Sequence, residues 1–262
     1  MISVIFCCGG SRGDLLTAAA LLDEPSITLQ GVVFSPGEGS EPSFFQELSL
    51  LLNGSAPAVI ANRSPLFQPD TAREEETKQG QLTALELLER AAGEGAAVLS
   101  TGRLTELALF FLAYPKQACR FWGIYAAGGA VYGGDRTPAA EASFYEDPEA
   151  AQIMVDHAAG MHLLPLETAE KCTAVLWDHP VPAPGLGLML CMMDQQAVRE
   201  EEHTLQIDLE SALSRGCSVI DWLNRDKQLP RHRICVDLDS ARFRPLAERA
   251  CTRLTKGGGP RG

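Results

Sequence analysis

The chain has 262 residues, of which 45% are hydrophobic and 21% charged, a globular composition that excludes a disordered or collagen-like protein. Its 22 basic and 34 acidic residues give a formal net charge of −12, so nucleic acid and anionic membrane surfaces are poor partners. Its eight cysteines are too sparse for a disulfide scaffold and show no zinc spacing. We therefore expect a cytoplasmic protein, without membrane spans, whose partner is a neutral or cationic small molecule or another protein.

Short apolar runs alternate with helical patterns, as in folds built from β-α-β units. The first half predicts a strand at 2–8, a helix from Asp14, a strand at 27–34, a helix at 44–52, a strand at 57–61, an exposed loop at 72–80, a helix at 82–92, a strand at 96–100, a helix at 105–112 and a strand at 121–127. The second half predicts a helix at 148–158, a strand at 163–165, a helix at 186–193, an edge-like strand at 204–209, strands at 217–222 and 233–238 and a helix at 243–254.

These elements predict one domain over residues 1–254, with an open, mostly parallel α/β sheet flanked by helices. A flexible glycine-rich tail is expected over residues 255–262. Ligands of such sheets bind beyond the carboxyl ends of the strands, which here are followed by residues 9–14, 35–39, 100–103 and 128–143. The first of these loops, GGSRGD, lacks the dinucleotide-binding glycine pattern, and the sequence contains neither a P-loop nor a GxSxG nucleophile motif.

Three stretches of sequence, in order along the chain, suggest a family. They are STGRLTELALFF (100–111), GGAVYGGDRTPAAEASFYEDPEAAQIM (128–154) and DLESALSRGCSVIDWLNRD (208–226). Together they resemble the inosine–uridine type nucleoside hydrolases, and the TPAAE…DPEAA segment is the most specific. The resemblance implies hydrolysis of the N-glycosidic bond of ribonucleosides. It also implies a Ca²⁺ ion that holds the ribose hydroxyls and a water, which an aspartate deprotonates.

The resemblance also shows where this chain departs from the family's chemistry. The positions equivalent to the family's metal-binding residues are Cys8, Asp14, Thr101 and Gly185. Only Asp14 keeps an acidic side chain there, and Gly13 or Arg12 stands in place of the general-base aspartate. We therefore expect no cofactor, with Ca²⁺ as the alternative, and Asp14 remains the candidate catalytic residue. Its structural alternative is a carboxylate that caps the following helix.

In the segment that binds ribose in the family, Glu141 matches a glutamate, whereas Asp135 and Ser143 replace two asparagines. These three residues are the candidate substrate-binding residues, with a salt-bridge or capping role as the alternative for Glu141. The segment 168–185 is much shorter than in the family, so we expect a more open pocket on that side, where residues 177–180 are candidates for a lid. Asp147 is expected to start a helix, and the run 200–203 to be a solvated face.

Two functions therefore stay open. The first is hydrolysis of a ribonucleoside or related compound with a degenerate Ca²⁺ site. The second is a non-catalytic member of the family that binds a nucleoside-like molecule in a regulatory role or as a structural partner subunit. Because members of the family commonly oligomerise, we expect a homo-oligomer or a complex with a related subunit.

Overall fold

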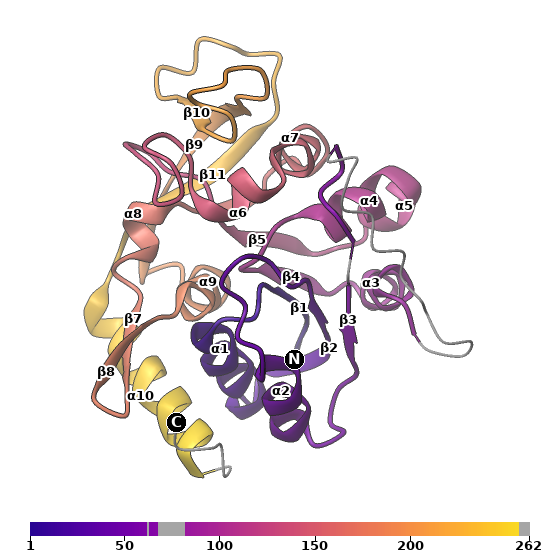
Figure 1. The fold of residues 1–262 in the computed structure, drawn as a ribbon, viewed down its shortest axis with the longest axis vertical. Helices are drawn as coiled ribbons and strands as arrows, with labels where there is room; N and C mark the ends of the chain where they lie inside the picture. Colours follow the sequence, from indigo (N-terminus) through magenta and orange to yellow (C-terminus); the bar gives the residue numbers. More distant parts are fainter. Residues whose placement is uncertain (62, 68–81, 257–262) are drawn as a thin grey trace.

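The computed structural model describes residues 1–61, 63–67 and 82–256 (Figure 1). The strands of this part of the chain are β1 (Ile2–Cys8), β2 (Ile27–Phe34), β3 (Ala58–Ile60), β4 (Ala97–Ser100), β5 (Gly123–Ala127), β6 (His162–Leu164), β7 (Thr173–Leu176), β8 (His179–Pro182), β9 (Val198–Ile207), β10 (Ser218–Asp221) and β11 (Arg231–Leu238). Within the described residues, nine of them form one sheet in the order β10-β9-β11-β6-β5-β4-β1-β2-β3. The neighbours from β11 to β3 are parallel, and β9 pairs antiparallel with β11 and β10. The prediction of an open, mostly parallel sheet is confirmed.

Helices cover both faces of this sheet. They are α1 (Arg12–Asp23), α2 (Phe44–Leu52), α3 (Ala84–Gly93), α4 (Thr105–Ala113), α5 (Pro115–Ala118), α6 (Ala142–Glu146), α7 (Pro148–His157), α8 (Leu166–Ala169), α9 (Pro184–Met193) and α10 (Ser240–Lys256). The apolar side chains of α1, α2, α9 and α10 pack on one face, and those of α3, α4 and α7 on the other. No helix among the described residues is long and apolar enough to cross a membrane.

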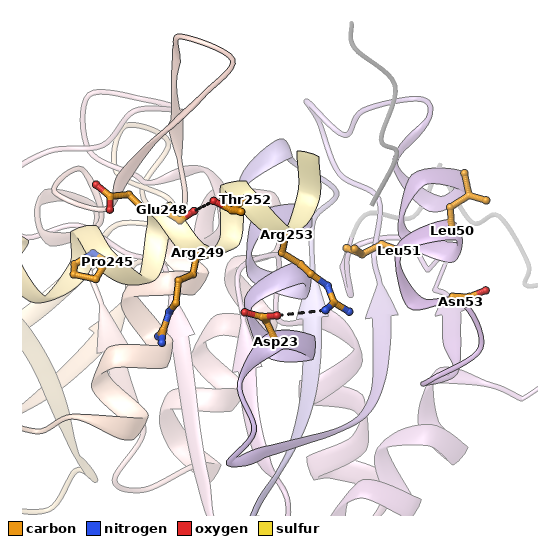
Figure 2. Close-up of a pocket in the computed structure, with 9 residues that line it drawn as sticks. All are labelled: Asp23, Leu50, Leu51, Asn53, Pro245, Glu248, Arg249, Thr252 and Arg253. Atoms are coloured by element: carbon orange, nitrogen blue, oxygen red, sulfur yellow. Dashed lines mark hydrogen bonds and ion pairs between the residues drawn. The ribbon is translucent and has the colours of Figure 1, made fainter. Parts of the chain in front are cut away.

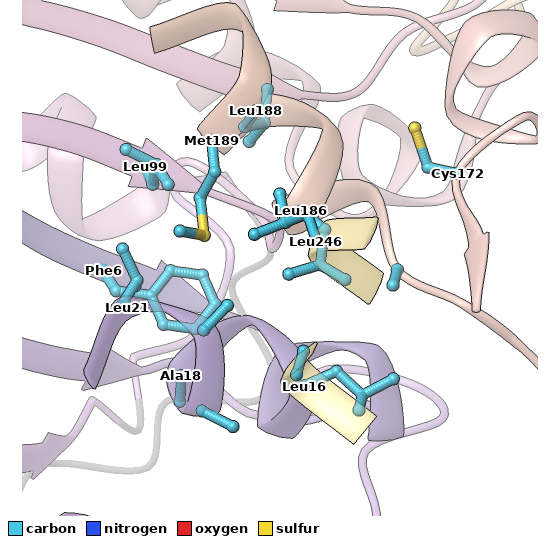
Figure 3. Packing of buried hydrophobic residues seen from close by; sticks show 14 of the residues in the cluster. Phe6, Leu16, Ala18, Leu21, Leu99, Cys172, Leu186, Leu188, Met189 and Leu246 are labelled. Carbon is cyan, nitrogen blue, oxygen red and sulfur yellow. The ribbon is translucent and has the colours of Figure 1, made fainter. Parts of the chain in front are cut away.

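The apolar run of β1 is explained by its central position. Successive side chains of a strand point to opposite faces, so Phe6 and Cys8 enter one core and Ile5 and Cys7 the other. Figure 3 shows the first of these cores, where side chains of β1, α1 and α9 lie together. Both cysteines are buried strand residues, as the apolar pattern predicts.

The structure corrects the prediction for β9. The strand begins at Val198 rather than residue 204, and it lies between β10 and β11 instead of at the edge. The run 200–203, expected as a solvated face, is therefore part of the sheet, and His203 is buried. Opposite charges on neighbouring strands explain why an acidic run pairs here, since Glu202 lies opposite Arg233 and forms an ion pair with it at 3.7 Å.

Three further differences concern short or terminal elements. The hairpin formed by β7 and β8 and the short helices α5, α6 and α8 were not predicted. The prediction of a flexible tail is wrong for residues 255 and 256, because α10 continues to Lys256 and the Thr255 hydroxyl donates to the Cys251 carbonyl at 2.9 Å. Residues 257–262, and the loop expected at 72–80, lie outside the described residues.

Candidate functional site

A cavity of about 380 Å³ lies at the carboxyl ends of the central strands. Its first wall follows β4 and β5 and consists of Thr101, Ala127, Gly128, Asp135, Glu141 and Ser143. Its second wall follows β6 and consists of Leu164, Leu166, Ala169, Glu170, Thr173, Pro182 and Pro184. The three residues predicted to bind substrate therefore lie around one cavity, together with Thr101, and the volume is within the ordinary range of about 300–1,000 Å³ for ligand sites.

Glu141 is the most buried acid of this cavity, with 9% of its surface exposed. It is the N-cap of α6, and its carboxylate accepts hydrogen bonds from the backbone N–H groups of Ser143 (2.9 Å), Phe144 (3.2 Å) and Gly129 (3.0 Å). Burial raises the pKa of Glu141 to about 7, although these three donors act in the opposite direction. The capping alternative is correct, and the same side chain also lines the cavity.

The turn after β5 requires glycine to bring the backbone N–H of Gly129 to this carboxylate. Gly129 has a φ of +69°, and a Cβ atom at Gly128 would lie 2.5 Å from the Phe144 ring. Asp135 is exposed farther along this segment, and its Oδ1 accepts the N–H of Ala142 at 2.9 Å. Asp135 and Glu141 therefore both hold the amino end of α6, where a negative charge is favoured.

Asp14 is placed differently, behind the wall of the cavity. Ser11 is the N-cap of α1, and Oδ2 of Asp14 accepts the N–H groups of Gly10 and Ser11, each at 2.9 Å, in a capping box. Its Oδ1 accepts the hydroxyl of Thr101 at 2.5 Å. Burial raises the pKa of Asp14, and hydrogen bonds, the one from Thr101 foremost, oppose this. The carboxylate ties the β1–α1 loop to the turn after β4, in agreement with the structural alternative.

Neighbouring atoms fill the space for a side chain at two other positions where the family resemblance places site residues. A Cβ atom at Gly13 would lie 2.0 Å from the Pro182 carbonyl oxygen, and one at Gly185 would lie 2.4 Å from the Thr17 hydroxyl. The amino end of α1 thus packs directly against the start of α9. Of the four positions equivalent to metal ligands, Thr101 lines the cavity, and the three others do not appear among its lining residues.

The residues present do not fit a Ca²⁺ ion. Calcium takes about 6–8 oxygen ligands, with several carboxylates among them. Here Asp14 supplies one carboxylate, Thr101 donates its hydroxyl to it, and Cys8 offers a buried thiol whose pKa is raised by burial and by Asp14. Within the described parts of the chain, no group of three or more His, Cys, Asp or Glu side chains is arranged to hold a metal.

Sequence reasoning missed the second wall of the cavity. Glu170, Thr173 and Pro182 belong to the short segment 168–185, which carries no motif of its own. The exposed residues of TAVL are Thr173 and Val175, and because Val175 is apolar the sequence shows no polar-apolar alternation that would have signalled this strand. The proposed lid residues 177–180 form the turn and the first part of β8 in this hairpin, and none of them is among the residues that line the cavity.

A larger groove, of about 1040 Å³, lies where α1 and α2 end and α10 passes (Figure 2). Arg253 of α10 forms an ion pair with Asp23 across it at 3.3 Å. The groove lies toward the amino ends of the strands, because α1 runs back from the carboxyl end of β1. We take the smaller cavity as the candidate site, since open α/β sheets bind ligands at the carboxyl ends of their strands.

Comparison with known proteins identifies the family. The sequence profile described as inosine-uridine preferring nucleoside hydrolase matches residues 4–245. The chain belongs to this family. It is 23% identical to the pyrimidine-specific ribonucleoside hydrolase RihA of Salmonella gallinarum, and 25% identical to RihA of Escherichia coli O7:K1. Each alignment covers 95% of this chain and 98% of the relative.

Solved structures of nucleoside hydrolases share the fold. An inosine-guanosine nucleoside hydrolase superposes with a TM-score of 0.82 at 15% identity, over 96% of this chain and 99% of that one. The inosine-uridine preferring nucleoside hydrolase of Bacillus anthracis superposes with a TM-score of 0.78 at 15% identity, over 97% and 100% of the two chains. At this identity the likeness shows the architecture alone.

Proposed function

We propose that this protein binds a ribonucleoside-like molecule in the cavity at the carboxyl ends of the strands, and that any cleavage of the N-glycosidic bond there proceeds without Ca²⁺. The observation that carries the proposal is the gathering of Thr101, Asp135, Glu141 and Ser143 around one cavity. Membership of the family and the names of the curated relatives, which are ribonucleoside hydrolases, support the choice of ligand.

The residues of the first wall suit a sugar. An ionised carboxylate is a strong hydrogen-bond acceptor for hydroxyl groups, and Glu141 and Asp135 are both held in place by backbone N–H donors. Because its pKa is raised to about 7, Glu141 also exchanges a proton near neutral pH, as a general acid or base must. Asp14 is less suited to that task, since it is not among the residues that line the cavity.

Binding without hydrolysis is the second candidate, and the position of Asp14 favours it. In a hydrolase of this family an aspartate activates water, whereas here Asp14 caps α1 and lies behind Thr101. Gly13 offers no replacement, since its Cα faces the Pro182 carbonyl too closely for a side chain. A protein of this kind would act by holding its ligand or by pairing with a related subunit.

A nucleoside panel separates the two candidates. Purified protein is incubated with purine and pyrimidine ribonucleosides, with Ca²⁺ or with a chelator, while binding and the release of base and ribose are measured. Release that the chelator leaves unchanged supports metal-free hydrolysis, and binding without release supports the second candidate. If no ribonucleoside binds or is cleaved, the proposed function is wrong, and turnover that requires Ca²⁺ overturns its metal-free part.

Two variants test whether the ligand binds in this cavity. Glu141→Gln removes the charge inside the cavity, and Glu89→Gln removes one from the exposed surface of α3. We expect Glu141→Gln to weaken binding while Glu89→Gln leaves it unchanged. Asp14→Asn tests the catalytic assignment, because loss of turnover with binding intact would make Asp14 a catalytic residue.

We also propose a cytoplasmic location, because the eight cysteines are all free in the structure and suit a reducing compartment. We also propose a homo-oligomer or a complex with a related subunit. Light scattering of the purified protein would measure its mass in solution and so test for the homo-oligomer.

A further inference from the structure

The charged groups on the cavity wall are all acidic. Asp135 comes from the segment after β5, Glu141 from the N-cap of α6, and Glu170 from the end of α8. Among the described residues that line the cavity, there is no Lys, Arg or His. A concave wall of one charge sign attracts ligands of the opposite sign and raises their local concentration.

The basic residues next to these acids in the sequence are engaged elsewhere. Arg136 follows Asp135 but forms an ion pair with Glu38, and Lys171 follows Glu170 but forms an ion pair with Asp237 at 2.7 Å. Glu141 is paired with backbone N–H groups and not with a side-chain cation. The negative charges of Asp135 and Glu170, and that of Glu141 above about pH 7, are therefore not balanced by neighbouring side-chain cations.

Apart from the hydroxyl residues Thr101, Ser143 and Thr173, the rest of the wall is apolar. Leu164, Leu166 and Ala169 come from β6 and α8, and Pro182 and Pro184 flank the start of α9. A bare inorganic cation gains nothing from such a surface, whereas an organic ring carrying a positive charge buries its faces against it. The three carboxylates come from both walls of the cavity, Asp135 and Glu141 from the first and Glu170 from the second.

Resting on the proposed function, we infer that this cavity selects N-ribosides whose base carries a fixed positive charge, such as an N-ribosylpyridinium or an N7-alkylated purine ribonucleoside. The sugar hydroxyls meet Glu141 and Asp135, and the charged ring lies within the acidic wall against the apolar side chains. Neutral nucleosides bind more weakly because they do not compensate the negative charge of the cavity wall.

The chemistry of such a ligand matches the residues at hand. When the bond between C1′ and the charged nitrogen breaks, its electron pair stays on the nitrogen, which becomes neutral without receiving a proton. A water oxygen then bonds to C1′, and the water's proton passes to the solvent. The products are ribose, the neutral base and one proton. This reaction needs no acid to protonate the leaving group, and His179, the histidine of the shortened segment, lies in the exposed hairpin and not among the lining residues.

A matched pair of ligands tests the inference. Nicotinamide riboside carries a positive ring, and its 1,4-dihydro form has the same size and no charge. Binding of both to the full chain is measured by calorimetry in a chelator, and the release of free nicotinamide from the charged form by chromatography. We expect the cation to bind about tenfold more tightly, which corresponds to about 1.4 kcal/mol. Equal binding of the two forms overturns the inference and leaves the proposed function standing, whereas no binding of either form or of any ribonucleoside overturns the proposed function.

Charge variants place the preference in the cavity. Asp135→Asn keeps an oxygen for the Ala142 N–H, and Glu170→Gln changes an exposed side chain, so both are expected to fold. Each should lower the preference for the cation about two- to fivefold, as for partly exposed ion pairs. Glu89→Gln removes the same charge outside the cavity and should leave the preference unchanged. An equal loss in all three variants, or no loss in either cavity variant, would assign the cation to the general acidic surface and overturn the inference.

Discussion

At the scale of single residues, two opposing effects determine the pKa of Glu141. Burial disfavours its ionised form, and three backbone N–H donors favour it. The balance raises its pKa from 4.5 to about 7, so the folded protein holds this proton over a range of pH in which the unfolded chain has released it. Stability from this group is therefore fully present below about pH 4.5 and is lost as the pH rises through about 7.

This shift predicts a pH-dependent difference between the wild type and Glu141→Gln. As the pH rises from about 5 to about 8, the free energy of unfolding of the wild type should fall relative to the variant, by about 2–3 kcal/mol. Urea denaturation of both proteins across this range measures the difference. Parallel stability curves would show that the carboxyl group ionises normally in the fold.

Asp147 shows how one buried carboxylate joins three segments. It caps α7 by accepting the N–H of Ala150 at 3.2 Å, and its Oδ2 accepts the Thr105 hydroxyl at 2.5 Å and the Leu66 N–H at 3.2 Å. The sequence predicted the helix start, and the links to α4 and to residue 66 are additional.

We expect Asp147→Ala to lower the free energy of unfolding by about 2–4 kcal/mol, because it removes a cap and leaves buried donors without acceptors. Thr83→Ala is the control, since Thr83 caps α3 at a more exposed site, and it should cost about 1 kcal/mol. Chemical denaturation gives both values, and equal losses would mean that the links to α4 and Leu66 contribute nothing.

At the scale of elements, the close contact between α1 and the β8–α9 corner shapes the site. Gly13 lies against the Pro182 carbonyl, and Pro182 in turn lines the cavity. The Pro182 carbonyl therefore occupies the space that a side chain at position 13 would need, so the loss of the acid and the close approach of the backbone belong to one packing arrangement.

Gly13→Ala should consequently lower the free energy of unfolding by about 1–3 kcal/mol, because its Cβ cannot fit without moving the corner. Gly93→Ala provides the control, since it lies at the end of α3 with nothing within 4 Å of the added Cβ, and it should stabilise the protein by about 0.4–1 kcal/mol. Thermal and urea unfolding of both variants tests the contrast, and a neutral Gly13→Ala would show that the corner moves freely.

The same elements show what the sequence could predict. The apolar run of β1 and the Asp-Pro start of α7 specify their structures locally, and the TPAAE…DPEAA motif correctly pointed to residues that share a cavity. The β7–β8 hairpin could not be predicted, because Pro180 and Pro182 interrupt the strand pattern and Trp177 and Asp178 both adopt positive φ in its turn. The sequence could not show whether Asp14 is a capping or a catalytic residue, because this depends on hydrogen bonds between segments far apart in the chain.

At the scale of the whole molecule, the net charge of −12 attracts cations to the entire surface. Ligand binding at the candidate site depends instead on a few local charges. Acidic residues throughout the chain attract divalent cations loosely, so weak binding of Ca²⁺ alone says little about a specific site. A specific site stabilises the folded state by mass action, by an amount that grows with the logarithm of the ratio of ligand concentration to dissociation constant, and this makes thermal unfolding a suitable measurement.

The donor set around Asp14 leads to the last prediction, that Ca²⁺ does not stabilise this protein specifically. One carboxylate whose oxygens already accept three hydrogen bonds cannot replace the hydration of the ion. Melting temperatures measured in a chelator, in millimolar Mg²⁺ and in millimolar Ca²⁺ should therefore agree, apart from a shift common to the two ions. A saturable rise in Ca²⁺ alone that Asp14→Asn abolishes would contradict this prediction and restore the family's metal site to the chain.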